Sequence, residues 1–368
     1  MKDEITARQT GCFCAISILA LKLVTLPSLL YEFSKTNGLI VALVLFLLDF
    51  VALYLILRIR QKYIGMSLYD ILQIFVGKII AKVIYCIIFA FLLLKLIMIV
   101  NEAVAYTQAI VDEDFTNLMF LMCFLPVITA VACSGLKNTA RTCEFGFIFI
   151  IIGLVVCLFL AETTTGFMQV GAIFNVSPLS ILSSSFNCSI WFADFLFLLI
   201  IMDKIKVEKN MNKRIFNVVI FVFLIVAVLY VIYFRLFRTT AFLHKNAIAD
   251  VTQYNRNIGN VGNVDIISIL VYLFVIFFQG SVYMSSLRIC FEKIVGYTSP
   301  TQATILINIL IVGLQYFLFY NLETTITFYL TYFKYVYIFL WLIILLISLG
   351  RKEKKYVPKN KENTKILQ

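Results

Sequence analysis

The chain has 368 residues, of which 62% are hydrophobic and 14% are charged, and its mean hydropathy is +0.98. This composition excludes a soluble globular domain and a disordered chain. The apolar runs are about 20 residues long, whereas a membrane-spanning β-strand needs only about 10 alternating residues. The sequence therefore predicts an all-α integral membrane protein with several transmembrane helices.

Motifs for metal binding, redox chemistry and catalysis are missing from the sequence. The nine cysteines are scattered without a CxxC pair, and His244 is the only histidine. Neither a disulfide framework nor a zinc or haem site is expected, and the thiols are interpreted as small packing residues. The Walker A, GxSxG, HExxH and GxGxxG patterns do not occur. We predict no metal, no cofactor and no enzymatic activity.

The hydropathy pattern predicts about ten transmembrane helices. They cover approximately residues 11–31, 38–57, 79–105, 117–134, 144–161, 183–202, 215–234, 264–287, 303–320 and 325–348. Most of the 31 lysines and arginines lie in the connections on one side, including the basic tail at 351–368. The positive-inside rule makes that side and both termini cytoplasmic. This topology and lipid contact by the tail account for the net charge of +11, so nucleic acid is not an expected partner.

The first predicted span contains two residues that are unusual for a lipid-facing helix. Pro27 cannot donate a backbone hydrogen bond, so it weakens the helix before it. Carbonyl groups freed in hydrocarbon need protein or water partners, and such a break is therefore expected to line a cavity. Lys22 lies roughly 18 Å into the segment at 1.5 Å per residue, near the middle of the bilayer. It is a functional residue, the partner of a buried carboxylate, or both.

The sixth predicted span begins with a polar stretch at residues 183–194. Small polar side chains can hydrogen-bond to nearby backbone groups and hold a locally unwound turn. Alternatively, this stretch is an extracellular loop and the span begins at Ile190. Both interpretations are open at the level of sequence.

Two interrupted helices five spans apart indicate an inverted repeat of two five-span halves. The halves would cover about residues 8–162 and 180–320, within a single transmembrane domain at 1–350. A ligand would bind between the interruptions, where half-helix N-termini offer N–H groups to a carboxylate. Gln279 and Tyr283 share one face of the eighth span and form either a packing seam or a ligand contact. The candidate ligand-binding residues are Ala20, Leu21, Lys22, Thr25, Ser189, Ile190, Trp191, Gln279 and Tyr283.

Charged residues within the spans nearly balance. Because an unpaired charge in the membrane costs several kcal/mol, they are expected to face the bundle interior and pair there. Each is as compatible with a structural ion pair as with a ligand contact. The predicted intramembrane charge network comprises Lys22, Asp49, Lys95, Glu102 and Asp194.

Several stretches carry a family resemblance. They are residues 5–9, the Leu26-Pro27-Ser28 break, the loop at 135–144, which reads G-x-x-x-x-A-R-x-x-E, and the acidic start of span eight at 263–265. With these, the sequence resembles the endospore germination permeases, the B-type membrane subunits of GerA-type spore germinant receptors. They belong to the amino acid–polyamine–organocation (APC) transporter superfamily, so the resemblance implies a LeuT/APC-like fold.

The resemblance also implies a function. The chain would sense a nutrient germinant, typically an amino acid, at the inner membrane of a bacterial spore. Its partners would be an A-type membrane subunit and a C-type lipoprotein subunit. A working secondary transporter (permease) for amino acids is the alternative, and a scaffold with an inert pocket is a third interpretation.

Overall fold

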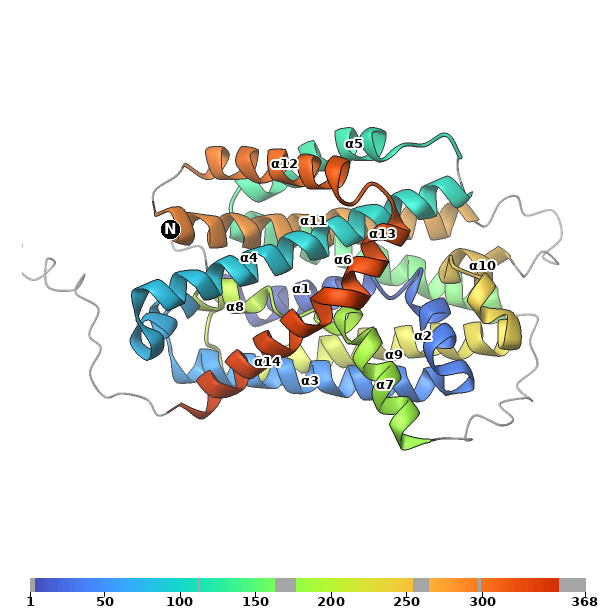
Figure 1. Ribbon diagram of the computed structural model, residues 1–368, viewed down its shortest axis with the longest axis horizontal. Helices are drawn as coiled ribbons and strands as arrows, with labels where there is room; N and C mark the ends of the chain where they lie inside the picture. Colours follow the sequence, from blue (N-terminus) through green and yellow to red (C-terminus); the bar gives the residue numbers. More distant parts are fainter. Residues whose placement is uncertain (1–3, 111–112, 163–176, 254–264, 297–298, 351–368) are drawn as a thin grey trace, which may run out of the picture.

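The computed structural model describes residues 4–110, 113–162, 177–253, 265–296 and 299–350. These residues form a bundle of helices, with one isolated pair of bridged residues, Ile5 and Ile205 (Figure 1). The α-helices are α1 (Ala7–Leu19), α2 (Leu26–Ser34), α3 (Gly38–Lys62), α4 (Leu68–Ile110), α5 (Asn117–Cys133), α6 (Leu136–Glu162), α7 (Pro178–Cys188), α8 (Leu198–Ile201), α9 (Met211–Phe237), α10 (Ala247–Gln253), α11 (Asp265–Val295), α12 (Pro300–Phe317), α13 (Leu322–Phe328) and α14 (Lys334–Leu349). Short 3₁₀ segments η1 (Lys35–Asn37), η2 (Ser189–Phe192), η3 (Met202–Lys204) and η4 (Arg238–Leu243), and the π-helical turn η5 (Tyr329–Phe333), join some of them.

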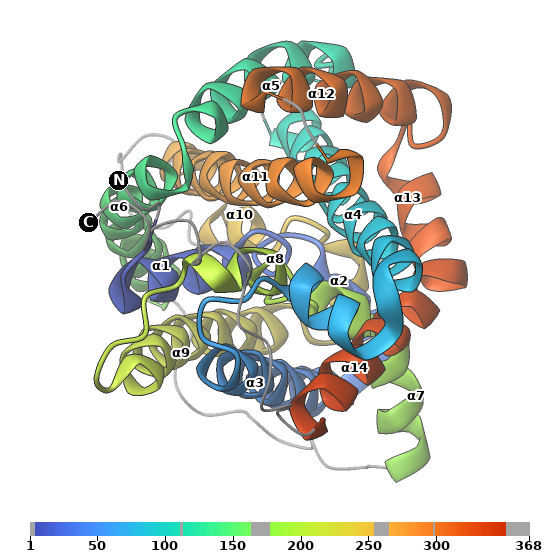
Figure 2. The ribbon, with the colours of Figure 1, turned by 90° about the vertical axis from the view of Figure 1, so that its left-hand side faces the viewer.

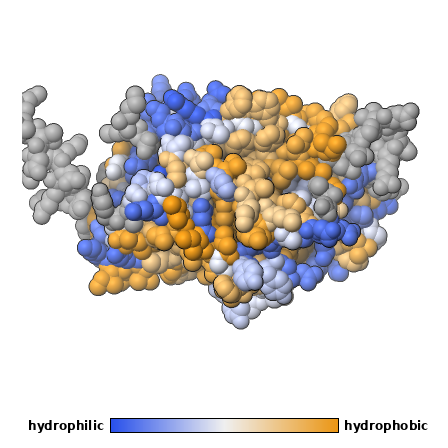
Figure 3. All heavy atoms as spheres, turned by 90° about the horizontal axis from the view of Figure 1, so that it is seen from above, coloured by the Kyte–Doolittle hydropathy of each residue, from blue (hydrophilic) through white to orange (hydrophobic). Residues whose placement is uncertain are grey.

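Within the described part of the chain, seven helices are long and apolar enough to cross a membrane. Their backbone groups are paired within each helix, which is the requirement for crossing hydrocarbon. Large apolar side chains are exposed on their outer faces, as Phe145 and Phe159 are on α6. Figure 3 shows apolar residues spread over much of one face of the molecule. The chain is therefore a multi-pass membrane protein.

Helix α1 lies in the middle of the bundle. All of its residues except Arg8 are buried, and it packs against α6, α9 and α11. In the end-on view, α1 and α8 lie between α11 on one side and α3 with α9 on the other (Figure 2). The first half of the broken first span and the last helix of the sixth predicted span, α1 and α8, are therefore enclosed by other helices (Figure 2).

The first predicted span consists of two helices, α1 and α2, separated by six residues in turns and bends. We call residues 20–25 the first interruption. Pro27 lies in the first turn of α2, where its missing N–H is tolerated. In a continuous helix that N–H would bond the carbonyl of Leu23, so the proline itself removes a partner within the break.

The polar stretch at 183–194 in the sixth predicted span is mostly helical and is not an extracellular loop. Residues 183–188 belong to α7 and residues 189–192 form η2, so only its last two residues leave the helix. Two of its hydroxyls bond to backbone carbonyls: Ser184 Oγ donates to Phe33 of α2 at 2.9 Å, and Ser189 Oγ donates to Phe186 of α7 at 2.8 Å. The non-helical residues come later, at 193–197. We call them the second interruption.

The N-terminal segment is tied to the chain that follows α8. The amide of Ile5 donates to the carbonyl of Lys204 at 2.9 Å, and the amide of Lys206 donates to the carbonyl of Ile5 at 2.9 Å. The guanidinium of Arg60, on α3, donates to the carbonyl of Ile205 through Nε and Nη2 at 2.9 and 2.6 Å. These contacts close the end of the bundle that the charge pattern predicts to be cytoplasmic.

Some predicted features lie outside the described residues. They are the basic tail at 351–368, most of the connection between the fifth and sixth spans at 163–176, and residues 263 and 264 of the acidic start of span eight.

Candidate functional site

Lys22 joins the two interruptions. It lies in the first interruption and is fully buried. Its Nζ donates to the carbonyl of Trp191 at 3.1 Å and forms an ion pair with Asp194, a residue of the second interruption. The ammonium also lies 4.5 Å from the centroid of the Phe192 ring, a distance at which a cation is attracted to the ring face.

Asp194 is shared between two buried ammonium groups. Its Oδ1 lies 3.7 Å from Nζ of Lys95, which projects from α4 and is itself fully buried. Asp49, buried on α3, lies within electrostatic reach of Asp194, Lys22 and Lys95. Four members of the predicted charge network thus come together from α3, α4 and the two interruptions. Buried charges persist only when they are paired, so this grouping compensates each of them.

Glu102, the fifth member, binds the N-terminal end of α2. Its Oε1 accepts a hydrogen bond from the backbone N–H of Thr25 at 2.8 Å and a second one from the Thr25 hydroxyl. Its Oε2 is buried and has no hydrogen-bond partner among the described residues. Glu102 follows Lys95 by seven residues on α4, which places both on one face of that helix. One face of α4 therefore contacts both the N-terminus of α2, through Glu102, and the ion-pair cluster, through Lys95.

The carbonyls of the first interruption are satisfied by remote parts of the chain. The amide of Ile248 donates to the carbonyl of Leu23 at 3.0 Å, and that of Ala247 donates to Val24 at 3.2 Å. Both amides belong to the first turn of α10. The hydroxyl of Tyr230, on α9, donates to the carbonyl of Lys22 at 3.1 Å. The break is thus held by tertiary hydrogen bonds, as irregular backbone in a membrane requires.

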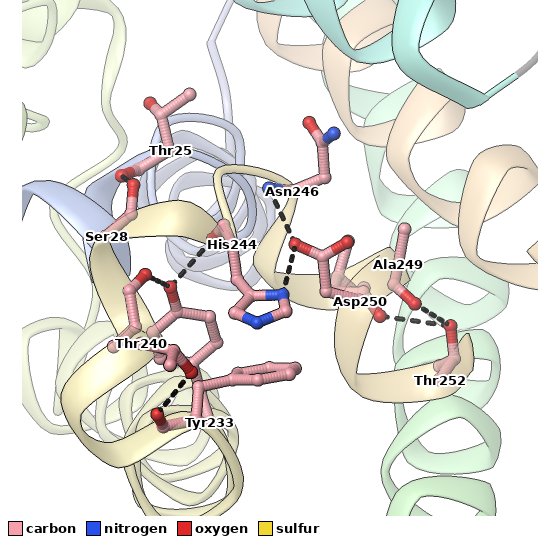
Figure 4. Close-up of polar contacts among 12 residues, drawn as sticks. Thr25, Ser28, Tyr233, Thr240, His244, Asn246, Ala249, Asp250 and Thr252 are labelled. Carbon is pink, nitrogen blue, oxygen red and sulfur yellow. Dashed lines mark hydrogen bonds and ion pairs between the residues drawn. The ribbon is translucent and has the colours of Figure 1, made fainter. Parts of the chain in front are cut away.

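A polar cluster holds α10 in this position (Figure 4). Asp250 accepts a hydrogen bond from the amide of Asn246 at 3.1 Å and lies 3.8 Å from Nδ1 of His244. The hydroxyl of Tyr233 donates to the carbonyl of His244 at 2.7 Å. Burial raises the pKa of the Asp250 carboxyl above its ordinary value, while the Asn246 amide and His244 act in the opposite direction. This cluster positions the two α10 amides that reach the first interruption.

Other predicted ligand-binding residues are buried around the same centre. Gln279, on α11, donates through Nε2 to the carbonyl of Ser17 on α1 at 3.2 Å. Tyr283, also on α11, packs edge-on against Phe197 with ring centroids 6.1 Å apart. The ring centroids of Trp191 and Tyr329 lie 6.5 Å apart. The remaining predicted residues, Ala20, Leu21 and Ile190, are buried apolar groups.

Two residues with charged or polar side chains do not join the cluster. Ser189 bonds within its own turn, as described above. Lys334 donates to Oδ1 of Asn187 at 3.1 Å and lies over the ring of Phe186, so it pairs on the flank of α7.

Several buried donors near the centre have no hydrogen-bond partner among the described residues, including Trp191 Nε1 and the hydroxyls of Tyr283 and Tyr329. Buried polar groups in proteins are almost always bonded, and such atoms are the ones available to a bound molecule. Among the described residues, no group of His, Cys, Asp or Glu side chains is arranged to hold a metal ion. The site therefore contains buried charged groups and these hydrogen-bond donors. Its two lysines, Lys22 and Lys95, are the counter-charges of its carboxylates.

Reasoning from the sequence missed the groups that complete the site. Tyr230 precedes the α10 amides by 17 residues, yet all of them meet the first interruption. Phe46 and Phe192, whose rings lie 4.8 Å apart, cover the ammonium of Lys22. An aromatic residue in an apolar span carries no sequence signal that separates this role from ordinary packing.

Comparison with known proteins identifies a structural neighbour and a family. The structure is similar to the crystal structure of the LeuT-fold transporter MhsT in complex with L-phenylalanine, with a TM-score of 0.69. That likeness covers 96% of this chain and 91% of that chain at 13% identity, and shows the fold. The search of curated proteins gives no match.

The family model of spore germination proteins, the spore permeases, matches residues 4–325. This match confirms the resemblance inferred from the sequence. Both family and fold are those of permeases and transporters and not of enzymes. The chain belongs to the spore germination protein family.

Proposed function

We propose that this protein is the B-type subunit of a spore germinant receptor. It binds a nutrient germinant in a transporter-like pocket between the two interruptions and signals to an A-type membrane subunit and a C-type lipoprotein. The family supports the setting at the inner membrane of a spore. The observation that carries the proposal is the buried charge cluster that links Lys22 in one interruption to Asp194 in the other.

An amino acid is the proposed ligand class. The MhsT structure contains L-phenylalanine, and the site offers groups of both signs to a zwitterion. Because a ligand shifts a conformational equilibrium only through its different affinity for the two states, binding here must favour one arrangement of the interruptions. A movement of α2 or of the second interruption would then be passed to the partner subunits. Transport is not required for this role.

The same proposal includes the transmembrane architecture. In it, α1 with α2 and α7 with α8 are the first and sixth of ten spans, related as corresponding members of two inverted five-span halves at about 8–162 and 180–320. The halves form one domain at 1–350, and both termini are cytoplasmic. The enclosed position of α1 and α8 in Figure 2 supports this arrangement, because substrate sites of inverted-repeat transporters lie at the interface of the repeats.

A secondary transporter for amino acids is the second candidate. The observation that favours it is the proximity of Asp49 and Asp194, two buried carboxyl groups that could carry a proton between the two sides of the membrane. Uptake of labelled amino acids into proteoliposomes under a pH gradient would establish this function. Binding without uptake would favour the receptor.

The receptor proposal is tested by a thermal-shift screen of amino acids on the detergent-solubilised protein. A ligand that binds the folded state raises the apparent melting temperature, by a few degrees at saturating concentration. Lys22→Met is the matched variant, since it removes the ammonium and leaves an apolar chain of similar length. The expected result is that an amino acid stabilises the native protein and that the variant loses this response or changes its preference. An absence of stabilisation by any amino acid would contradict the proposed ligand class.

A further inference from the structure

The N-terminus of α2 already holds an anion. A helix N-terminus carries a partial positive charge and free N–H groups, which together favour a carboxylate. In α2, a helix of nine residues, Pro27 supplies no N–H to this end. The amide and the hydroxyl of Thr25 both donate to one oxygen of Glu102. The place in which a ligand carboxylate would be recognised is therefore occupied by a side chain of α4.

We propose that Glu102 is a built-in ligand of this site, so that a carboxylate ligand must displace it from Thr25 in order to bind. The inference rests on the proposed ligand site between the interruptions and adds how that site is regulated. Contact of Glu102 with α2 and contact of a ligand carboxylate with α2 become mutually exclusive. The unliganded protein then holds itself in one state, and the ligand replaces an internal contact.

The position of the carboxylate supports this role. Glu102 is fully buried, and its Oε2 has no hydrogen-bond partner among the described residues. A carboxylate with a structural role alone would be expected to have both oxygens bonded, since an unsatisfied buried oxygen costs about 1–3 kcal/mol. Glu102 also lies 77 residues from Thr25 in sequence, on a different helix, so its contact breaks when α2 and α4 move apart.

Lys22 forms the counterpart at the other interruption. Its ammonium donates to the carbonyl of Trp191, in the last turn of η2, and pairs with Asp194. Carbonyl ends of helices favour cations for the same reason that their N–H ends favour anions. The carboxylate and the ammonium of a zwitterion thus each have an internal equivalent, Glu102 and Lys22. When Glu102 and Lys22 both occupy the places of the ligand charges, the charges of the site are satisfied without a ligand.

Rescue of Glu102→Ala by a free carboxylate tests the proposal. The apparent melting temperature of the solubilised variant is measured in sodium acetate and in sodium chloride at equal ionic strength. If the α2 N-terminus is a carboxylate site, acetate should stabilise Glu102→Ala by roughly 2 °C or more over chloride. The native protein and Glu102→Gln should respond equally to both salts, because a side chain still fills the site. Glu323→Ala, at an exposed acid in the first turn of α13, controls for loss of a carboxylate elsewhere.

Several outcomes would overturn the proposal. They are an equal response of Glu102→Ala to the two salts, an acetate effect of the same size in Glu102→Gln, or failure to recover folded Glu102→Ala from either salt. Recovery of folded variant in acetate but not in chloride would support it. Because acetate is not the germinant, this test is separate from the amino-acid screen. A positive rescue without any amino-acid binding would sustain the carboxylate site and reject the proposed ligand class.

Discussion

The two interruptions are stabilised in opposite ways. In the first, the carbonyls of Leu23 and Val24 receive their hydrogen bonds from α10, which lies more than 200 residues away in sequence. In the second, the backbone bonds are local: the amide of Leu198 donates to Phe195 at 3.0 Å, and that of Ile200 donates to Phe197 at 3.0 Å. The first interruption is therefore held by hydrogen bonds from distant parts of the chain, whereas the second is a series of tight turns.

This difference assigns separate roles to the two segments. A backbone held by remote partners changes when those partners move, so the first interruption is the part that neighbouring helices can control. A backbone with local hydrogen bonds depends less on its neighbours, and the second interruption places Asp194 between two lysines. Substitutions that remove the anion and substitutions that remove remote donors should therefore have different effects.

The largest effect is expected for Asp194→Leu. It leaves the ammonium groups of Lys22 and Lys95 buried without their shared anion, and breaking such a buried pair costs about 3–5 kcal/mol. The measurement is the fraction of monodisperse protein and its thermal stability in detergent. The double variant Lys22→Met/Asp194→Leu should recover part of the loss, and a double variant no better than Asp194→Leu would show that the charges are not the cause.

Lys22→Met should cost less than Asp194→Leu. Asp194 keeps Lys95 at 3.7 Å and therefore retains one counter-charge, and an apolar side chain inserts into the membrane more easily than lysine. We expect a loss of about 1–2 kcal/mol in stability together with an altered germinant response. Germination assays of spores that carry the variant provide the second readout. Equal losses for the two single variants would refute the shared-anion arrangement.

A smaller effect is expected for Tyr230→Phe, which removes the donor to the carbonyl of Lys22 in the first interruption. Loss of one buried hydrogen bond corresponds to about 1 kcal/mol. The same substitution at Tyr316, which is 76% exposed, is the matched control and should leave stability unchanged. If the first interruption is the controllable segment, Tyr230→Phe should also change ligand affinity. An unchanged affinity would show that the hydrogen bond from α9 to the first interruption does not control ligand binding.

The smallest effect is expected from the pH dependence of Asp250. Because burial raises its pKa above 3.8, the folded state binds more protons than the unfolded state between 3.8 and the raised value. The free energy of unfolding should therefore fall as pH rises through this window and be regained on acidification. Asp250→Asn removes this dependence and keeps an acceptor for the Asn246 amide. The difference in the free energy of unfolding between variant and native protein, measured at each pH, should grow in the variant's favour with rising pH, by under about 1 kcal/mol. A constant difference would show that Asp250 does not titrate in this range.

The sequence predicted irregular backbone a few residues before the second interruption, for an identifiable reason. The small polar residues at 183–189 suggested irregular backbone, but the hydroxyls of Ser184 and Ser189 bond to carbonyls and the helix stays intact. The residues that do leave the helix, 193–197, are mostly apolar and include neither proline nor glycine. Their conformation follows from enclosure among other helices and from the pairing of Asp194, neither of which is a property of the local sequence.

Composition, hydropathy and a few motif residues were sufficient to predict a helical membrane protein of the spore permease family. Burial in a bilayer also required that the ionisable residues within the spans find partners, so the members of the charge network could be proposed from residue type alone. The tertiary structure alone decided which charges pair, that Glu102 binds the N-terminus of α2, and that α10 supplies the amides for the first interruption. These contacts join residues 77 to more than 200 positions apart, and their existence depends on how the helices pack together.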